Sequence, residues 1–410
     1  PETPADQDYD LPNAGEQEKE AVFRIRDLKT SDSKTNHPSA ILKYENFRHY
    51  VDYFNRMEDE NIVQAIPNSK ANEWMEKNIP LFECPQDNFE EMYYYRWWTL
   101  RKHIKKTPVG YVMTEFLVDR SYADKYNMIS CALGHHIYES RWLHDPRYLD
   151  QYVHAWYRGN EGKPMEKLRK FSSWTADALY HRFLVNNDKK FLIDMLPDLD
   201  WEYCSRESDH RLESGLFWQE DVRDGMEESI SGGRRKKYAR PTINSYMYGN
   251  ARALSKIYTM IGDNLSAEKY RLKSDTIQHL VEQKLWNEDH QFFETLQGDS
   301  LANVREAIGY LPWYFNLPSS VKFDVAWKQV MDEEGFLAPY GLTTAERRHP
   351  LFRKAGCCNC EWDGAIWPFA TAQTMTAMAN FMNNHSQNIL TDSVYFKLME
   401  LYVECQYHRG

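Results

Sequence analysis

Five carboxyl groups gather in one stretch of the sequence and are the residues best suited to proton chemistry. Within nine residues the chain carries Glu220, Asp221, Asp224, Glu227 and Glu228, beside Trp218 and Arg223. Like charges at this spacing raise one another's pKa, which can keep a carboxylic acid protonated near neutral pH for general-acid work. A solvated acidic loop would show the same charge pattern, but it would need neither Trp218 nor Met226. We therefore predict that this stretch, the acid loop, contributes to a reaction site.

A second stretch, residues 356–369, combines carboxylates with two tryptophans just before a segment rich in small residues. Trp362 and Trp367 would offer flat apolar platforms with an N–H donor, while Glu361 and Asp363 would accept hydrogen bonds from sugar hydroxyls. A pocket that stacks a sugar ring and moves a proton needs both kinds of side chain. The alternative is a buried Trp pair that closes a helix start, where the helix dipole favours Glu361.

Helices must position these stretches, because apolar residues recur at i, i+3 and i+4 through most of the chain. We predict helices over residues 46–57, 89–105, 123–139, 147–158, 171–185, 189–204, 244–260, 266–285, 303–311, 321–331, 365–382 and 391–408. Strand-like alternation is confined to residues 109–117 and 290–295.

The helices pair in unequal hairpins without a fixed-length repeat, which disfavours repeat arrays and favours a closed ring of helices. The long loops 205–241 and 338–363 would build a pocket at one end of that ring. The sequence thus predicts a polar N-terminal arm, residues 1–42, and a single helical domain, residues 43–410.

Composition narrows the possible partners. The net charge of −11 disfavours nucleic acid, and no apolar run approaches the length of a membrane span. Seven cysteines include Cys357, Cys358 and Cys360, but the chain has no second C-x-x-C and no His pair at zinc spacing. We therefore expect no metal and no organic cofactor. The polar N-terminus without Met suggests a trimmed protein that is secreted or periplasmic, and the sequence sets no oligomeric state.

The acid loop carries a family resemblance. Asp224-Gly-Met-Glu-Glu-Ser resembles the Ser-Gly-apolar-Asp-x-Ser signature of the (α/α)6-barrel glycosidases of families 63 and 37, which include processing α-glucosidase, trehalase and mannosylglycerate hydrolase. Glu227 stands where those enzymes carry their acid Asp. Trp362-Asp-Gly-Ala-Ile-Trp-Pro is similar to their Trp-Arg-Gly-Pro-x-Trp-Pro, with Asp363 in place of a sugar-binding Arg. The similarity extends over about residues 88–410 and is strongest to the mannosylglycerate-hydrolase-like set.

The resemblance implies an all-α (α/α)6 toroid and an exo-acting, inverting glycoside hydrolase with a carbohydrate substrate. Either Glu227 or Asp224 would be the catalytic acid. The substrate would be held by Trp218, Arg240, Asn244, Glu361, Trp362, Asp363 and Trp367. Two other functions stay open: a carbohydrate-binding toroid without catalysis, and a lyase or epimerase that uses His135, His136 or Tyr248.

The resemblance also implies twelve helices, of which eleven can be counted from Phe89 onward. In related enzymes the catalytic base precedes the twelfth helix, so we expect the natural polypeptide to continue beyond Gly410. The predicted helices 391–408 and 89–105 should then not contact each other directly. Either a gap or a substitute such as the N-terminal arm should lie between them. A carboxyl group such as Glu361 or Glu115 opposite the acid would instead complete the site.

Overall fold

The computed structural model describes residues 42–354 and 360–407. Its α-helices are α2 (Arg48–Phe54), α3 (Ala71–Asn78), α4 (Asp87–Lys102), α5 (Leu133–Ser140), α6 (Arg147–Arg158), α7 (Thr175–Asn186), α8 (Lys189–His210), α9 (Pro241–Ile261), α10 (Asn264–Lys284), α11 (Leu311–Tyr314), α12 (Pro368–Asn384) and α13 (Asp392–Glu404), with a long 3-10 segment, η7 (Val321–Met331). Within the described ranges no helix is long and apolar enough to cross a membrane. The predicted arm, apart from Leu42, lies outside those ranges.

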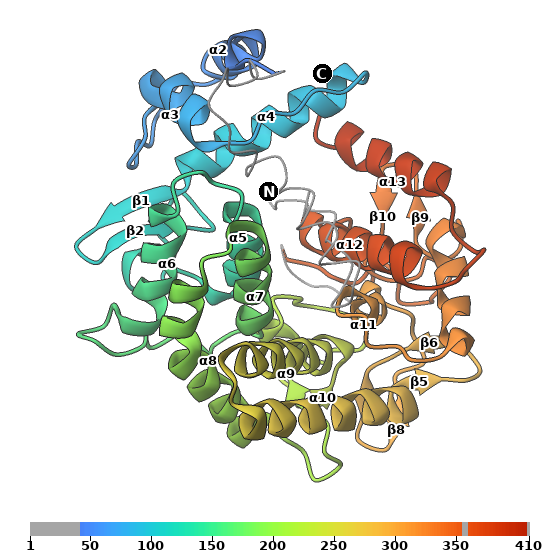
Figure 1. The fold of residues 1–410 in the computed structure, drawn as a ribbon. Coiled ribbons are helices and arrows are strands. Elements are labelled where there is room, and N and C mark those ends of the chain that lie inside the picture. The colour runs from blue at the N-terminus through green and yellow to red at the C-terminus, as the bar shows by residue number, and fades with distance from the viewer. Residues whose placement is uncertain (1–41, 355–359, 408–410) are drawn as a thin grey trace, which may run out of the picture.

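The helices form a ring of two layers (Figure 1). The inner layer runs through the successive contacts α5–α7, α7–α9, α9–α11 and α11–α12, while α6, α8, α10 and α13 each pack behind the inner helix next to them. The inner helix α12 is buried on all sides: every residue from Phe369 to Phe381 is buried, and most are small or apolar. A helix of that composition suits the interior of a ring, where no face meets water. The predicted all-α toroid is confirmed.

Most helices lie where apolar spacing placed them, and α6 has the predicted bounds. Three predictions are wrong. The helix α3 was not predicted, and the predicted helix 303–311 is a short 3-10 turn, η6 (Ala307–Tyr310), that leads into α11. Residues 123–132 are not part of a continuous helix, and α5 begins only at Leu133. Tyr126 and Asn127 adopt positive φ values of 62° and 66°. The Asn127 side chain donates to the backbone oxygens of Phe116 and Val118, at 2.7 and 3.2 Å. Such side-chain bonds to the backbone compete with helix formation.

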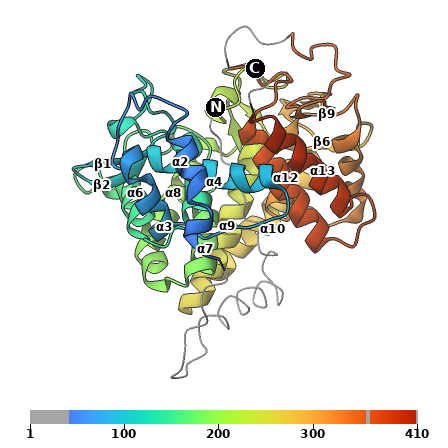
Figure 2. The same cartoon turned by 90° about the horizontal axis from the view of Figure 1, so that it is seen from above.

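Short strands bind the long loops to one another. Strands β1 (Ile104–Thr107) and β2 (Gly110–Met113) form an antiparallel hairpin, and β5 (Trp286–Asn287) pairs with β6 (Phe292–Phe293). A four-stranded sheet, not predicted, has the order β3 (Trp218–Gln219), β4 (Tyr238–Ala239), β7 (Leu296–Gln297), β8 (Ser300–Leu301). A last pair joins β9 (Leu337–Ala338) and β10 (Gly341–Leu342). Figure 2 shows the α8–α9 connection and the segment around β9 at the same end of the ring.

The seam between α13 and α4 corrects an expectation. The two helices contact each other directly, whereas a gap or a substitute was expected between them. The rings of Phe89 and Phe396 lie 5.4 Å apart, and the Tyr407 hydroxyl donates to the Asn88 carbonyl oxygen at 3.2 Å and to a Glu91 carboxylate oxygen at 3.1 Å. Aromatic side chains on both helices cover the apolar flank that an open seam would expose.

Candidate active site

The acid loop and the Trp362 segment meet in space, as the sequence predicts. The backbone N–H of Trp362 donates to the Glu227 carbonyl oxygen at 3.0 Å. The Cys360 thiol donates to Oε2 of the Glu227 carboxyl group at 3.2 Å. Thr344 fixes the other side of the segment, since its hydroxyl donates to the carbonyl oxygens of Trp362 and Ala365, both at 2.9 Å. Residues far apart in sequence therefore surround one carboxyl group.

A tight backbone turn places Glu227 at this point. Gly225 has φ of 72°, in the left-handed region that glycine adopts without steric cost. A Cβ atom at Gly225 would lie 2.3 Å from the Cys131 sulfur, so no other residue fits there without displacing Cys131. The next residue, Met226, is buried and its N–H donates to the Asp221 carbonyl oxygen at 3.0 Å. The turn then presents Glu227 toward the Trp362 segment.

Burial and neighbouring charges favour the protonated form of Glu227. The half-buried side chain has a raised pKa, first because of burial and also because of the charge on Asp221. The Cys360 hydrogen bond and the charge on Arg234 act in the opposite direction. Burial and the charge on Glu227 raise the pKa of Glu115 to about 7. The charge on Glu227 thus favours the protonated form of Glu115.

Asp224, the other possible acid, has a different environment. Its side chain is fully buried and its carboxylate accepts three hydrogen bonds. The Ser172 hydroxyl and the Arg240 Nε each donate at 2.6 Å, and the Thr242 hydroxyl donates as well. Three donors, one of them cationic, suit a carboxylate that acts as an acceptor only. Asp224 is thus placed to hold the loop together rather than to face a substrate.

Arg240 and Asn244, expected to hold sugar hydroxyls, are fully buried beneath the acid loop. Arg240 precedes α9, where Pro241 occupies the first turn and favours the helix start. The Asn244 side chain accepts from the Phe217 N–H at 2.8 Å and donates to the Phe217 and Arg240 carbonyl oxygens at 2.9 and 2.8 Å. Both residues anchor the loop to α9, a task different from the one the sequence suggests.

Trp218 lies on strand β3 at the edge of the acid loop. Its half-buried ring packs against His210, with centroids 4.5 Å apart, and the Lys237 ammonium lies 4.1 Å from the ring centroid. These contacts come from the loop and from the end of α8. The structure thus brings Trp218 together with His210 and Lys237, whereas Trp362 and Trp367 lie against each other.

Trp362 and Trp367 form a stacked pair, with centroids 5.4 Å apart and planes 4° from parallel. Trp362 is 4% exposed and also contacts Phe369 edge to face. Trp367 precedes the first residue of α12, is half-buried, and donates its indole N–H to the Glu361 carbonyl oxygen at 2.7 Å. The pair therefore closes the start of α12, and Trp367 is the more accessible member.

Arg353 pairs with both carboxylates of the Trp362 segment. It forms ion pairs with Glu361 at 3.1 Å and with buried Asp363 at 3.4 Å, and its backbone N–H donates to the Asp363 carbonyl oxygen at 2.8 Å. The sequence did not single out Arg353 as a site residue. Arg353 offers a cation beside two carboxylates, a feature of the loop that only its folded conformation reveals.

The histidines of the alternative lyase function lie in the aromatic interior of the ring. Burial lowers the pKa of His135 and of His136 to about 3. His135 contacts the rings of Trp174 and Phe369, at 5.0 and 4.3 Å, and His136 shares a hydrogen bond with the Tyr152 hydroxyl at 2.9 Å. In the described ranges no three His, Cys, Asp or Glu side chains are grouped to hold a metal ion, and Cys357 and Cys358 lie outside those ranges.

A two-layered ring of helices is the architecture of the six-hairpin glycosidases. Residues 125–410 match the family described as the mannosylglycerate hydrolase MGH1-like glycoside hydrolase domain, and the chain belongs to this family. The match begins after residue 88, where the resemblance was expected to start.

Several proteins are similar to this chain in structure or in sequence. A solved structure described as a sialidase is 70% identical, with a TM-score of 0.89 over 90% of this chain and 34% of its own. The GH63 mannosylglycerate hydrolase of Thermus thermophilus, in its complex with Tris, has a TM-score of 0.53 at 12% identity, over 73% of this chain and 88% of its own. An uncharacterized protein of Borreliella burgdorferi is 25% identical over 186 residues, 45% of this chain and 38% of that protein. The chain thus spans little more than a third of the sialidase structure, and its match to the Borreliella protein covers a similar share of that protein.

Proposed function

We propose that this chain is the catalytic domain of an exo-acting, inverting glycoside hydrolase and that Glu227 is its general acid. The observation that carries the proposal is a set of two half-buried carboxyl groups with raised pKa values: burial raises the pKa of Glu227, and burial together with the charge on Glu227 raises the pKa of Glu115 to about 7. A general acid must hold its proton at the working pH, and a pair of carboxyl groups that repel each other does so. The family of the chain supports this chemistry.

In the proposed reaction the protonated Glu227 carboxyl group gives its proton to the glycosidic oxygen as the bond from that oxygen to the anomeric carbon breaks. Water attacks the anomeric carbon from the opposite face and loses its proton to a second carboxylate. Inversion requires about 6.5–9.5 Å between the two carboxyl groups, so that the water fits between them. Asp224, Arg240 and Asn244 would hold the acid loop in place, and the accessible face of Trp367 would carry the sugar.

The substrate class is a carbohydrate whose terminal residue is released. The names of the similar structures suggest two substrate classes, sialosides and glycosides of small acids such as mannosylglycerate. The 34% coverage of the sialidase structure means that its name can describe another part of that protein. We also propose secretion or a periplasmic location, supported by the polar N-terminal composition.

The test uses the natural full-length polypeptide and a panel of aryl glycosides, mannosylglycerate, sialosides and oligosaccharides. The product anomer is read by proton NMR within the first turnovers. We expect Glu227→Gln to lower kcat by about 10²–10⁴-fold, because an amide has the shape of the acid but cannot donate the proton. The matched control is Glu220→Gln in the same loop, where Glu220 is half-buried and lies 3.8 Å from Arg223.

Each outcome decides a separate point. Full activity of Glu227→Gln would remove Glu227 as the acid. A product with the substrate's own anomeric configuration would overturn inversion and indicate a covalent intermediate. Absence of hydrolysis across the panel, together with binding of the same sugars, would support the carbohydrate-binding toroid instead.

A further inference from the structure

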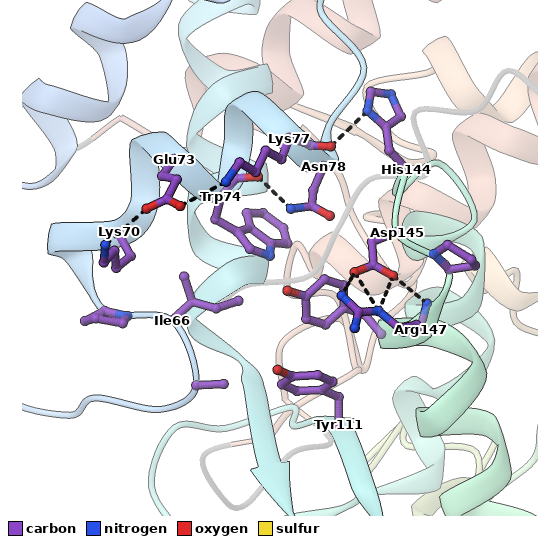
Figure 3. Close-up of a pocket in the computed structure, with 14 residues that line it drawn as sticks. Ile66, Lys70, Glu73, Trp74, Lys77, Asn78, Tyr111, His144, Asp145 and Arg147 are labelled. Carbon is purple, nitrogen blue, oxygen red and sulfur yellow. Dashed lines mark hydrogen bonds and ion pairs between the residues drawn. The ribbon is translucent and has the colours of Figure 1, made fainter.

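A hollow of about 680 Å³ is lined by residues between Ala65 and Tyr148 and by none of the acid loop (Figure 3). Its walls come from α3, from strand β2 and from the turn that leads into α6. The residues that matter for its chemistry are Lys70, Glu73, Trp74, Lys77, Tyr111 and Arg147. None of them takes part in the site described above.

Hydrogen bonds join the two walls of this hollow. The backbone N–H of His144 donates to the Asn78 carbonyl oxygen at 2.8 Å, and the His144 ring nitrogen Nδ1 lies 3.2 Å from the Lys77 carbonyl oxygen. Within α3, the Asn78 amide donates to the Trp74 carbonyl oxygen at 2.8 Å. The C-terminal end of α3 is thereby fixed against the turn before α6. The hollow is therefore preformed, which lowers the entropic cost of binding a ligand.

Aromatic rings form the inner surface of the hollow. Tyr111 and Tyr148 lie 4.8 Å apart between ring centroids, and Trp74 meets Tyr148 edge to face at 5.9 Å. Trp74 and Tyr148 are buried, whereas Tyr111 is half-buried, and Figure 3 shows the Trp74 and Tyr111 rings on facing sides of the hollow. Aromatic rings that border an open space suit the apolar faces of sugar rings.

The rim carries more positive than negative charge. The ammonium groups of Lys70 and Lys77 share the single Glu73 carboxylate, at 3.1 and 2.9 Å. Arg147 pairs with Asp145, with Nε at 2.9 Å and a terminal nitrogen at 2.6 Å from its oxygens. Among the residues that line the hollow, three cations thus face two carboxylates, in a chain whose net charge is −11. The surplus cation favours an anionic ligand, and Lys77, at 65% exposure, is free to reorient toward it.

We infer that this hollow is a second carbohydrate site, one that binds an acidic oligosaccharide through its aromatic wall and its lysine rim. The choice of a carbohydrate rests on the proposed function, whereas the preference for an anion rests on the rim. Strand β2 leads from Tyr111 in the hollow toward Glu115 beside the acid, four residues later and at most about 14 Å away.

The inference is tested with the full-length protein carrying Glu227→Gln, so that a bound glycan is not consumed. Calorimetry measures the Kd of a uronic-acid oligosaccharide, a sialylated one, a sulfated one and a neutral one of equal length. We expect at least one acidic glycan to bind, more weakly as salt rises. In the same protein, Tyr111→Ala and Lys77→Glu should each raise the Kd by about tenfold or more, because each removes one stacking or charge contact with the glycan. Lys322→Glu is the matched control, because Lys322 is an exposed lysine paired with Glu288 at 3.4 Å elsewhere on the surface.

Two results would overturn the inference: unchanged binding in both Tyr111→Ala and Lys77→Glu, or equal binding of the neutral glycan. Lys77 is exposed, so its variant keeps the test valid even where Tyr111→Ala folds poorly. With Glu227 intact, both variants should hydrolyse a short aryl glycoside at the normal rate. The glycan binding of the Tyr111 and Lys77 variants tests the hollow alone. The turnover of Glu227→Gln tests the proposed function alone. The three acidic glycans distinguish which anion the rim prefers.

Discussion

Replacing Asp224 should damage stability, whereas replacing Glu227 should damage catalysis, and the contrast separates the two possible acids. In Asp224→Asn one carboxylate oxygen becomes an amide nitrogen. That nitrogen, a donor, then faces either Ser172, which donates to Oδ1 of Asp224, or Arg240 and Thr242, which both donate to Oδ2. The guanidinium of Arg240 loses its direct counter-charge while it stays fully buried.

The expected magnitude follows from the burial of both partners. Breaking a buried ion pair by removing one charge costs about 3–5 kcal/mol, because the other charge stays uncompensated. The charges of Asp221 and Glu306 also interact with Arg240, which places the expected loss near the lower end, about 3 kcal/mol. A domain stable by about 5–15 kcal/mol stays folded after such a loss. Glu227→Gln removes a half-buried carboxyl group whose hydrogen bond comes from a thiol, and should cost less than about 1 kcal/mol.

Urea unfolding followed by tryptophan fluorescence measures both values, and the chain contains 13 Trp. The expected pattern is a lowered midpoint with residual turnover for Asp224→Asn, and a normal midpoint with little turnover for Glu227→Gln. A normal midpoint and abolished turnover in Asp224→Asn would contradict this reasoning and make Asp224 the acid.

Three further predictions concern the surroundings of Glu227. Cys360→Ala removes a hydrogen bond that lowers the pKa of Glu227, so the loss of kcat/KM at alkaline pH should move to higher pH; a move to lower pH would exclude this role. Glu115 has a folded pKa of about 7 against 4.5 in the unfolded chain, so its ionisation makes the stability of the protein fall between pH 4.5 and 7. Glu115→Gln should abolish that fall, seen as a higher free energy of unfolding at alkaline pH than in the parent, whereas a lower value would refute it. Gly225→Ala should destabilise the protein by more than about 1 kcal/mol and reduce its turnover, because residue 225 has a positive φ and its new Cβ atom would clash with Cys131. Adding Cys131→Ala to this variant should restore part of the stability. A free energy of unfolding equal to that of the parent protein in Gly225→Ala would contradict this reasoning.

Local patterns in the sequence were sufficient for the helical architecture. The 3.6-residue periodicity of residues 147–158 predicts α6 with its observed bounds, because an amphipathic helix shows its buried face directly in the spacing of apolar residues. The small-residue segment after Trp367 likewise indicates an inner helix. Where polar side chains bond to the backbone, as at Asn127, periodicity misleads, and residues 123–132 are not a continuous helix.

The contacts within the candidate site depend on the tertiary structure. The acid loop could be recognised from its carboxylates and its family signature, and its approach to the Trp362 segment could be predicted from their shared chemistry. The hydrogen-bond partners of Arg240 and Asn244 could not be predicted. A side chain that can bind a sugar hydroxyl group can equally bind a carboxylate or a backbone carbonyl group. Their burial beneath the loop decides between these uses.

The sequence by itself thus determined the class of fold and the family, and it singled out the stretch that holds the candidate acids, because these depend on local spacing and on a short motif. Only the tertiary structure decided how the carboxyl groups of that stretch differ. Cys360 lies 133 residues from Glu227, and the Glu115 carboxyl group, which Glu227 perturbs, belongs to the segment after β2. Asp224 and Glu227 have similar chemistry as residue types. Their difference arises from the three donors that enclose Asp224 and from the burial of Glu227 beside another carboxyl group.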